Sequence, residues 1–138
     1  MTRGKKRRVV LLGSTGSIGV STLKVAKNLR NEIEIVGLAA CSNVAKLAEQ
    51  ALATGVQNVA IYDKSKEKEL RALLPPSVKI HTGAEGLNAL SELSEADVVL
   101  VAIVGTAGLQ PALTAIEAGK DLAVASKEIL VMAGEIIT

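Results

Sequence analysis

Short apolar runs alternate with longer amphipathic segments along almost the whole chain. The short runs, such as DVVLVAIV, are apolar at consecutive positions, which is typical of strands covered on both faces in a parallel sheet. The longer segments repeat their apolar residues at helical spacing. Strands are therefore predicted at 8–12, 33–40, 58–62, 78–81, 97–104 and 121–125, and helices at 17–30, 44–53, 64–74, 84–93 and 109–118. A last helix is expected to begin near Lys127.

Individual residues support these boundaries. Asn43 and Asp63 are expected to cap helix N-termini, Gly119 to end one helix, and the pair Pro75 and Pro76 to terminate another. The regular alternation predicts an α/β fold with a doubly wound, mainly parallel sheet, as in Rossmann-like dinucleotide-binding domains. The chain shows no internal repeat, low-complexity segment or linker, so residues 1–138 are interpreted as one domain.

Composition and charge narrow the range of partners. Tyr62 is the only aromatic residue, which argues against a base-stacking surface for single-stranded nucleic acid. Sixteen basic and fourteen acidic residues leave a net charge of +2, too balanced to indicate a polyanion, and TRGKKRR is interpreted as a solvated tail. The following run VVLL is too short for a signal peptide or a membrane span, and the lone Cys41 excludes an internal disulfide. We expect a cytoplasmic protein without nucleic-acid or membrane partners.

Candidate chemistry begins where the first predicted strand ends, in VVLLGSTGSIG. Gly13, Gly16 and Gly19 stand between a strand and a helix, and glycine permits positive φ and lets a pyrophosphate approach the backbone. The helix N-terminus adds free N–H groups and the positive end of its dipole, and Thr15 and Ser17 add hydroxyl donors. A tight turn without a ligand is the alternative, but this position in an α/β chain favours nucleotide binding.

The end of the second predicted strand bears on which nucleotide is bound. NAD-preferring domains usually place Asp or Glu there, about twenty residues past the turn, to hold the ribose 2′-hydroxyl. This chain has Cys41, Ser42 and Asn43 instead. A carboxylate would repel a 2′-phosphate, whereas hydroxyl and amide groups can donate to it, so the sequence favours NADP. Ser42 and Asn43 can also cap the next helix, and the two roles are compatible.

A third group of candidates follows the last two predicted strands. Gly105 and Gly108 mark a further turn between a strand and a helix, and ASKE places Ser126, Lys127 and Glu128 at the end of the next strand. Ligands of such folds lie at the carboxyl ends of the strands, so this position favours a site role. A solvent-facing loop that leads into a helix is the alternative.

Three segments together, LLGSTGSIGVSTL, AIVGTAGLQPALTAIEAGK and ASKEILVMAG, resemble the N-terminal domain of the 1-deoxy-D-xylulose 5-phosphate reductoisomerases. The resemblance runs from Val9 to about Gly134. It implies an NADPH-dependent oxidoreductase that rearranges the carbon skeleton of a phosphorylated sugar. The aldehyde that results is then reduced to 2-C-methyl-D-erythritol 4-phosphate, in non-mevalonate isoprene biosynthesis. The resemblance also implies a divalent metal, Mg or Mn, and a homodimer for the complete enzyme.

The resemblance implies roles for particular residues. Thr15, Gly16, Ser17 and Ile18 would contact the pyrophosphate region of NADPH; Cys41, Ser42 and Asn43 would surround the adenosine ribose and its 2′-phosphate; Ser126 and Glu128 would border the nicotinamide; and Lys127 would point toward the substrate. Two of these positions depart from the family pattern. Ser42 stands where a basic residue is usual, which removes a charge-assisted contact to the 2′-phosphate, and Ser126 replaces an asparagine.

The resemblance also implies that the acidic metal-binding block and the substrate-binding and C-terminal domains would follow Thr138. No catalytic residue or metal ligand is expected within this chain, and the lone His81 is interpreted as a strand-end surface residue. We expect the NADPH-binding part of a longer enzyme, inactive alone, because the sequence stops inside an apparent helix. A stand-alone NADP-binding or regulatory module is the main alternative, and semialdehyde or homoserine dehydrogenases, which lack the third segment, are a more distant one.

Overall fold

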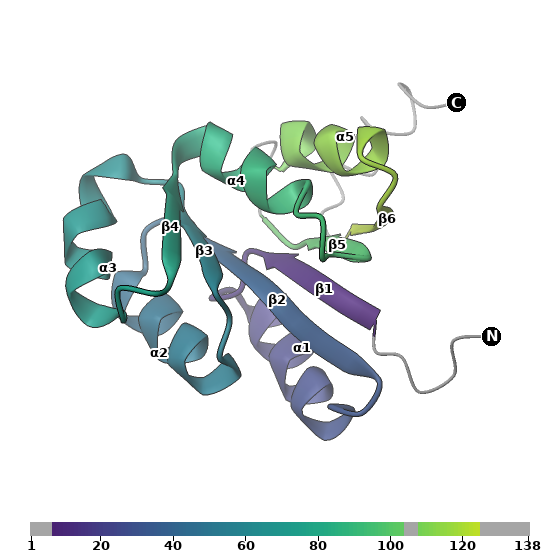
Figure 1. Ribbon diagram of the computed structural model, residues 1–138, viewed down its shortest axis with the longest axis horizontal. Coiled ribbons are helices and arrows are strands. Elements are labelled where there is room, and N and C mark those ends of the chain that lie inside the picture. Colours follow the sequence, from purple (N-terminus) through teal and green to yellow (C-terminus); the bar gives the residue numbers. More distant parts are fainter. Residues whose placement is uncertain (1–6, 104–107, 125–138) are drawn as a thin grey trace.

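The computed structural model describes residues 7–103 and 108–124, which form one parallel sheet with helices on both faces (Figure 1). Six strands lie in the order β4-β3-β2-β1-β5-β6, and every neighbouring pair is parallel. Their bounds are β1 Arg7–Leu12, β2 Ile33–Ala40, β3 Asn58–Ile61, β4 Lys79–Thr82, β5 Val98–Val101 and β6 Asp121–Val124. The predicted doubly wound α/β fold is confirmed.

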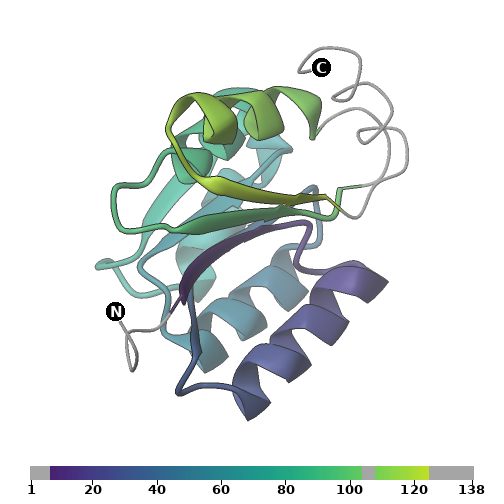
Figure 2. The ribbon, with the colours of Figure 1, turned by 90° about the vertical axis from the view of Figure 1, so that its right-hand side faces the viewer.

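The helices divide between the two faces of the sheet, as Figure 2 shows. They are α1 Ser17–Asn28, α2 Val44–Thr54, α3 Glu67–Leu73, α4 Gly83–Ser91 and α5 Leu109–Glu117. Ala26, Leu47 and Leu70 place α1, α2 and α3 against one core, whereas Leu87 and Ala112 place α4 and α5 against the other. Right-handed crossovers require this division, because the chain winds away from β1 first in one direction and then in the other.

Strand β1 explains why the sequence shows consecutive apolar residues. Val9 and Leu11 belong to the core beneath α1, α2 and α3, and Val10 and Leu12 belong to the core beneath α4 and α5. Successive side chains of a strand point to opposite faces, so a strand covered on both faces needs apolar residues at every position. Val10, Leu11 and Leu12 are completely buried.

The predicted helix boundaries hold with one correction. The Asn43 side chain caps α2 by accepting from the N–H of Lys46, at 3.2 Å, and Gly119 follows α5 with a φ of +78°. The helix predicted at 64–74 is wrong in its first turn, which is a separate 3-10 turn, η1 (Lys64–Lys66). Its cause is local: Asp63 accepts hydrogen bonds from both the N–H and the hydroxyl of Ser65. The helix expected from Lys127 lies outside the described residues.

No helix in the described ranges combines the length and apolar character that a membrane crossing demands. The edges of the sheet are the first sites to consider, because ligands of doubly wound folds bind there. The direction of winding reverses between β1 and β5, and the crevice at the carboxyl ends of the strands at such a reversal is where ligands bind in doubly wound folds. The glycine-rich turn after β1 lies at this reversal.

One contact at the opposite edge gives a pH-dependent prediction. The Asp97 carboxylate accepts from the backbone N–H of Arg8 at 2.9 Å and lies 3.6 Å from the Arg8 Nε. This backbone hydrogen bond, with help from the Arg8 charge, lowers the pKa of Asp97 below its usual value near 3.8. A carboxylate whose folded pKa is depressed stabilises the fold above its unfolded pKa, and this contribution is lost as the pH falls through the folded pKa.

We therefore expect Asp97→Asn to unfold at a lower denaturant concentration than the parent at pH 7. The difference between the two midpoint denaturant concentrations should narrow steadily as the pH falls below the usual pKa of Asp, because the parent then loses the charge of Asp97 as well. Urea unfolding at several pH values checks this expectation. Asp121→Asn is the matched control: its partner Arg7 is joined to it by an exposed ion pair, so a smaller effect is expected. A gap that does not depend on pH would contradict the prediction.

Candidate functional site

Two of the three glycines in the turn after β1 are required by packing. A Cβ on Gly13 would lie 2.7 Å from the carbonyl oxygen of Ala102, and Gly13 also has a φ of +94°. A Cβ on Gly19 would lie 2.2 Å from the carbonyl oxygen of Gly13 and 2.6 Å from the Cα of Ser14. Gly13 thus brings the turn against the residues that follow β5, and Gly19 brings α1 against the turn.

Gly16 differs, because nothing in residues 7–103 and 108–124 requires it to be a glycine. Its φ of −79° and ψ of 174° suit any residue, and the nearest atom to an added Cβ would be the Gly13 carbonyl oxygen at 3.8 Å. Gly16 is exposed at the N-cap of α1, where no side chain caps the helix. The missing side chain leaves open space at the helix N-terminus, which is the requirement for close approach of a phosphate.

The donors around this space fit an anion. The backbone N–H groups of Ser17 and Ile18 have no hydrogen-bond partner among the described residues. The side chain of Ser17 is exposed and that of Thr15 half-buried, so both hydroxyls are near the surface of the turn. Ile18 is 47% exposed and gives the same surface an apolar component. The arrangement can bind a phosphate or pyrophosphate with backbone and hydroxyl donors at the positive end of a helix.

Gln50 supports the turn from α2, and the sequence analysis missed it. Its side-chain amide donates to the backbone carbonyl of Ser14 at 2.9 Å, and both residues are buried. The N–H groups of Gly13 and Ser14 donate to the carbonyl of Ala39 at 2.8 and 2.9 Å. The turn is therefore fixed by β2 and α2 as well as by β5. The available signal was a polar residue on the buried face of α2, among Leu47, Ala48 and Ala51.

The second group of candidates lies next to this turn, after β2. Cys41, Ser42 and Asn43 are all exposed. The Asn43 side-chain oxygen accepts from Lys46, whereas its NH2 group has no partner in the described part of the chain and can donate to a ligand. The N–H of Asp63 donates to the carbonyl of Cys41 at 2.9 Å, so the loop after β3 borders this group. The hydrogen bonds from Ser65 lower the pKa of Asp63 and keep its carboxylate charged.

The structure thus brings the first two groups together at one edge of the sheet. The third group, Ser126, Lys127 and Glu128, lies outside the described residues, as does Gly105; Gly108 directly precedes α5. Among the residues that the structure describes, no cluster of three or more His, Cys, Asp or Glu could hold a metal ion.

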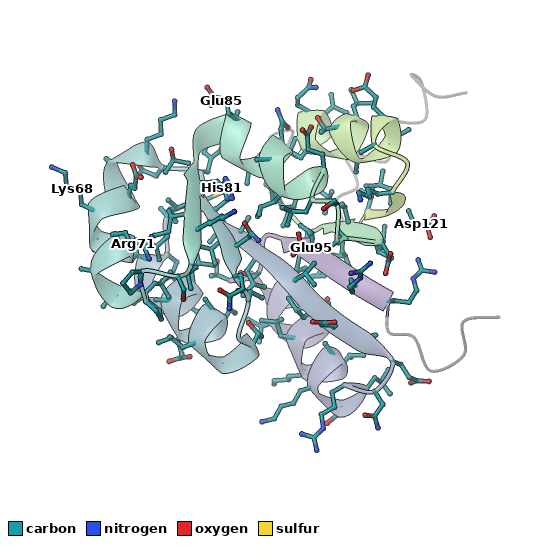
Figure 3. All side chains as sticks on the ribbon, in the orientation of Figure 1. Lys68, Arg71, His81, Glu85, Glu95 and Asp121 are labelled. Atoms are coloured by element: carbon teal, nitrogen blue, oxygen red, sulfur yellow. The ribbon has the colours of Figure 1, made fainter. Side chains whose placement is uncertain are left out.

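His81 lies in β4, two strands away from β2 in the sheet. The prediction that it is a surface residue at a strand end was only partly right. It is half-buried within β4, and its Nε2 lies 3.2 Å from the side-chain oxygen of Asn58 in β3 (Figure 3). Burial, with the nearby charge of Lys79, lowers the pKa of His81. A neutral ring that donates to Asn58 fits a structural link between the edge strand β4 and its neighbour β3.

Comparison with known proteins decides the family. The family model for 1-deoxy-D-xylulose 5-phosphate reductoisomerase matches residues 9–134. The chain belongs to this family. A reductoisomerase from Thermoanaerobacter sp. (strain X514) is 48% identical over 131 residues, which are 95% of this chain and 34% of that protein. The reductoisomerase of Chloroherpeton thalassium is 46% identical over 133 residues, with 96% and 34% covered. The chain therefore spans about a third of the length of these relatives.

Solved structures of the reductoisomerase family have the same fold. The enzyme from Zymomonas mobilis in complex with NADPH is 38% identical and superimposes with a TM-score of 0.88, covering 96% of this chain and 35% of that one. A reductoisomerase in complex with NADPH, fosmidomycin and magnesium is 37% identical with a TM-score of 0.82, covering 94% and 32%. The six-stranded sheet described above is thus the N-terminal fold of a reductoisomerase.

Proposed function

We propose that this chain is the NADPH-binding portion of a 1-deoxy-D-xylulose 5-phosphate reductoisomerase. The observation that carries the proposal is the space at Gly16, at the reversal of the sheet. It is bordered by the N–H groups of Ser17 and Ile18, which have no hydrogen-bond partner within residues 7–103 and 108–124. This space fits the pyrophosphate of a dinucleotide. Thr15 and the Ser17 hydroxyl would add donors, and Ile18 would pack against the cofactor.

The residues after β2 would hold the adenosine ribose and its 2′-phosphate. Ser42 and the NH2 group of Asn43 can donate to a phosphate. None of Cys41, Ser42 and Asn43 carries a carboxylate that would repel it. Ser42 carries no charge, so the 2′-phosphate would gain less here than from a basic residue. We assign Ser126 and Glu128 to the nicotinamide side and Lys127 to the substrate, on the family resemblance alone.

In the whole protein, NADPH would supply the hydride that reduces the rearranged aldehyde. The substrate would be the phosphorylated sugar 1-deoxy-D-xylulose 5-phosphate, and the divalent metal, Mg or Mn, would be held by residues outside this chain. We further propose that the complete enzyme is a cytoplasmic homodimer in isoprene biosynthesis. The chain alone would bind NADPH without turning over the substrate.

Cys41 makes the proposal directly testable, because it is the only cysteine and is exposed beside Ser42. Bound NADPH would cover its thiol, so we expect saturating NADPH to slow alkylation of Cys41 by iodoacetamide by about tenfold or more, in proportion to the occupied fraction. NADH should give the same protection only at higher concentration, because it lacks the 2′-phosphate. Mass spectrometry of the intact protein over time measures both rates.

A variant with its single cysteine at another position provides the control. In the double variant Cys41→Ser and Ser77→Cys, the thiol lies in the exposed turn before the amino end of β4, at the opposite edge of the sheet. NADPH should leave its alkylation rate unchanged. Equal rates for Cys41 with and without millimolar NADPH would overturn the proposal for this chain. Protection of both cysteines would mean a global change rather than a bound cofactor at this edge, and would overturn it as well.

A further inference from the structure

A groove separates α1 from α2 on the face of β2. The two helices lie side by side beneath the sheet in both ribbon views (Figures 1 and 2). The groove has a volume of about 690 Å³, and Ile33 and Ile35 of β2 contribute to its lining. Leu23 lines it from α1 and Ala53 from α2. Its size is that of sites for small organic ligands, which are mostly apolar inside.

Charged side chains also line the groove, and positive charge predominates. Four basic residues, against only the two acidic residues Glu34 and Glu49, contribute to the lining: Lys24, Lys27, Arg30 and Lys46. Within the described ranges, none of these six residues takes part in an ion pair. The positive charge is therefore not neutralised by the protein's own carboxylates in these ranges, and it would attract an anionic group.

Gln50 connects the groove to the glycine-rich turn. It lines the groove although only 8% of it is exposed. Its side-chain NH2 group donates to Ser14, but its side-chain oxygen has no hydrogen-bond partner among the described residues. That oxygen is itself shielded from solvent, so a ligand in the groove would not reach it.

We propose that this groove binds a small anionic amphiphile, a hydrocarbon chain with a phosphate or carboxylate head. The hydrocarbon part would lie on Leu23 and Ile35, where burial of apolar surface drives binding. The head would lie among the basic side chains, with Lys24 and Lys27 as its main partners. A groove enclosed by two helices suits a single dissolved molecule better than a flat membrane surface.

The first test uses three probes with the same tail. Octyl phosphate is titrated into the full chain by calorimetry below its micelle concentration, beside octanol and octyltrimethylammonium. We expect one saturable site for octyl phosphate, affinity at least about tenfold lower for octanol, and no binding of the cation. Equal affinity of all three probes would overturn the proposal. If the chain sediments with anionic vesicles but does not bind octyl phosphate, the groove belongs to a membrane-binding surface, and the proposal would be overturned too.

Variants then locate the site. Ala53→Trp fills the groove from an exposed position on α2, and the pair Lys24→Glu and Lys27→Glu reverses charge on its α1 side. Each is expected to weaken octyl phosphate binding about tenfold or more. Lys68→Glu, on α3 and pointing away from the rest of the molecule in Figure 3, is the matched control and should bind as the parent does. Because all these residues are exposed, circular dichroism should show parent-like folding. Parent-like binding by both groove variants would overturn the proposal.

Discussion

Replacement of Gly19 by alanine is expected to lower the free energy of unfolding by about 2–3 kcal/mol or more, as forced overpacking does. In an ordinary helix position the same substitution stabilises by up to about 1 kcal/mol, because glycine is the poorer helix former. Here the new methyl group would lie 2.2 Å from the Gly13 carbonyl oxygen and 2.6 Å from the Ser14 Cα. Both are backbone atoms of a turn fixed by β2 and Gln50, so neither can move aside cheaply. Whether Gly19→Ala lowers or raises the free energy of unfolding therefore decides between overpacking and helix propensity.

Urea unfolding monitored by circular dichroism measures this change, and Gly16→Ala provides the control within the same turn. A Cβ at Gly16 meets nothing nearer than 3.8 Å, so the loss should stay below about 1 kcal/mol, the ordinary cost of alanine at an N-cap. A parent-like or more stable Gly19→Ala would show that α1 does not pack on the turn as the structure describes.

The sequence predicted where the turn lies, but not what each glycine does in it. Three glycines at equal spacing look alike along the chain. Gly13 is required by Ala102, almost ninety positions later, and Gly19 by the backbone of the turn itself, whereas Gly16 is required by neither. Only the packed structure makes this distinction, because it depends on how the turn packs against Ala102 and against α1. The distinction matters, since it separates a glycine kept for the fold from one available to a ligand.

The fold was predictable because its strongest signal is local. Consecutive apolar residues in β1 and β2 and amphipathic helices between strands follow directly from a parallel sheet covered on both faces. Errors arose where a side chain competes with the backbone, as Asp63 does in η1, or where a polar residue is buried for a distant partner, as Gln50 is for Ser14. The positions of the first two candidate groups were predictable for the same reason, because both directly follow strands; their role in binding stays a prediction.

The largest expected effect on cofactor binding comes from Gly16→Asp. Aspartate is among the best N-cap residues, and its charge suits the positive end of α1, so the fold should be as stable as the parent or more so. The same carboxylate would occupy the open space and accept from the N–H groups of Ser17 and Ile18, and it would repel a pyrophosphate. We expect NADPH affinity to fall by at least about a hundredfold, as measured by nicotinamide fluorescence.

Gly16→Asn separates charge from shape in this experiment. Asparagine has nearly the same size and caps helices as well as aspartate, but it carries no charge. Its loss of NADPH affinity should be nearer to tenfold, roughly the effect of filling the space alone. If both variants fold and bind NADPH with parent-like affinity, as judged by the protection of Cys41 from alkylation, the phosphates do not bind at this turn. If Gly16→Asp and Gly16→Asn weaken NADPH binding equally, filling the space at Gly16 accounts for the whole loss. The added charge would then have no effect, which would place the pyrophosphate beyond the reach of the helix N-terminus.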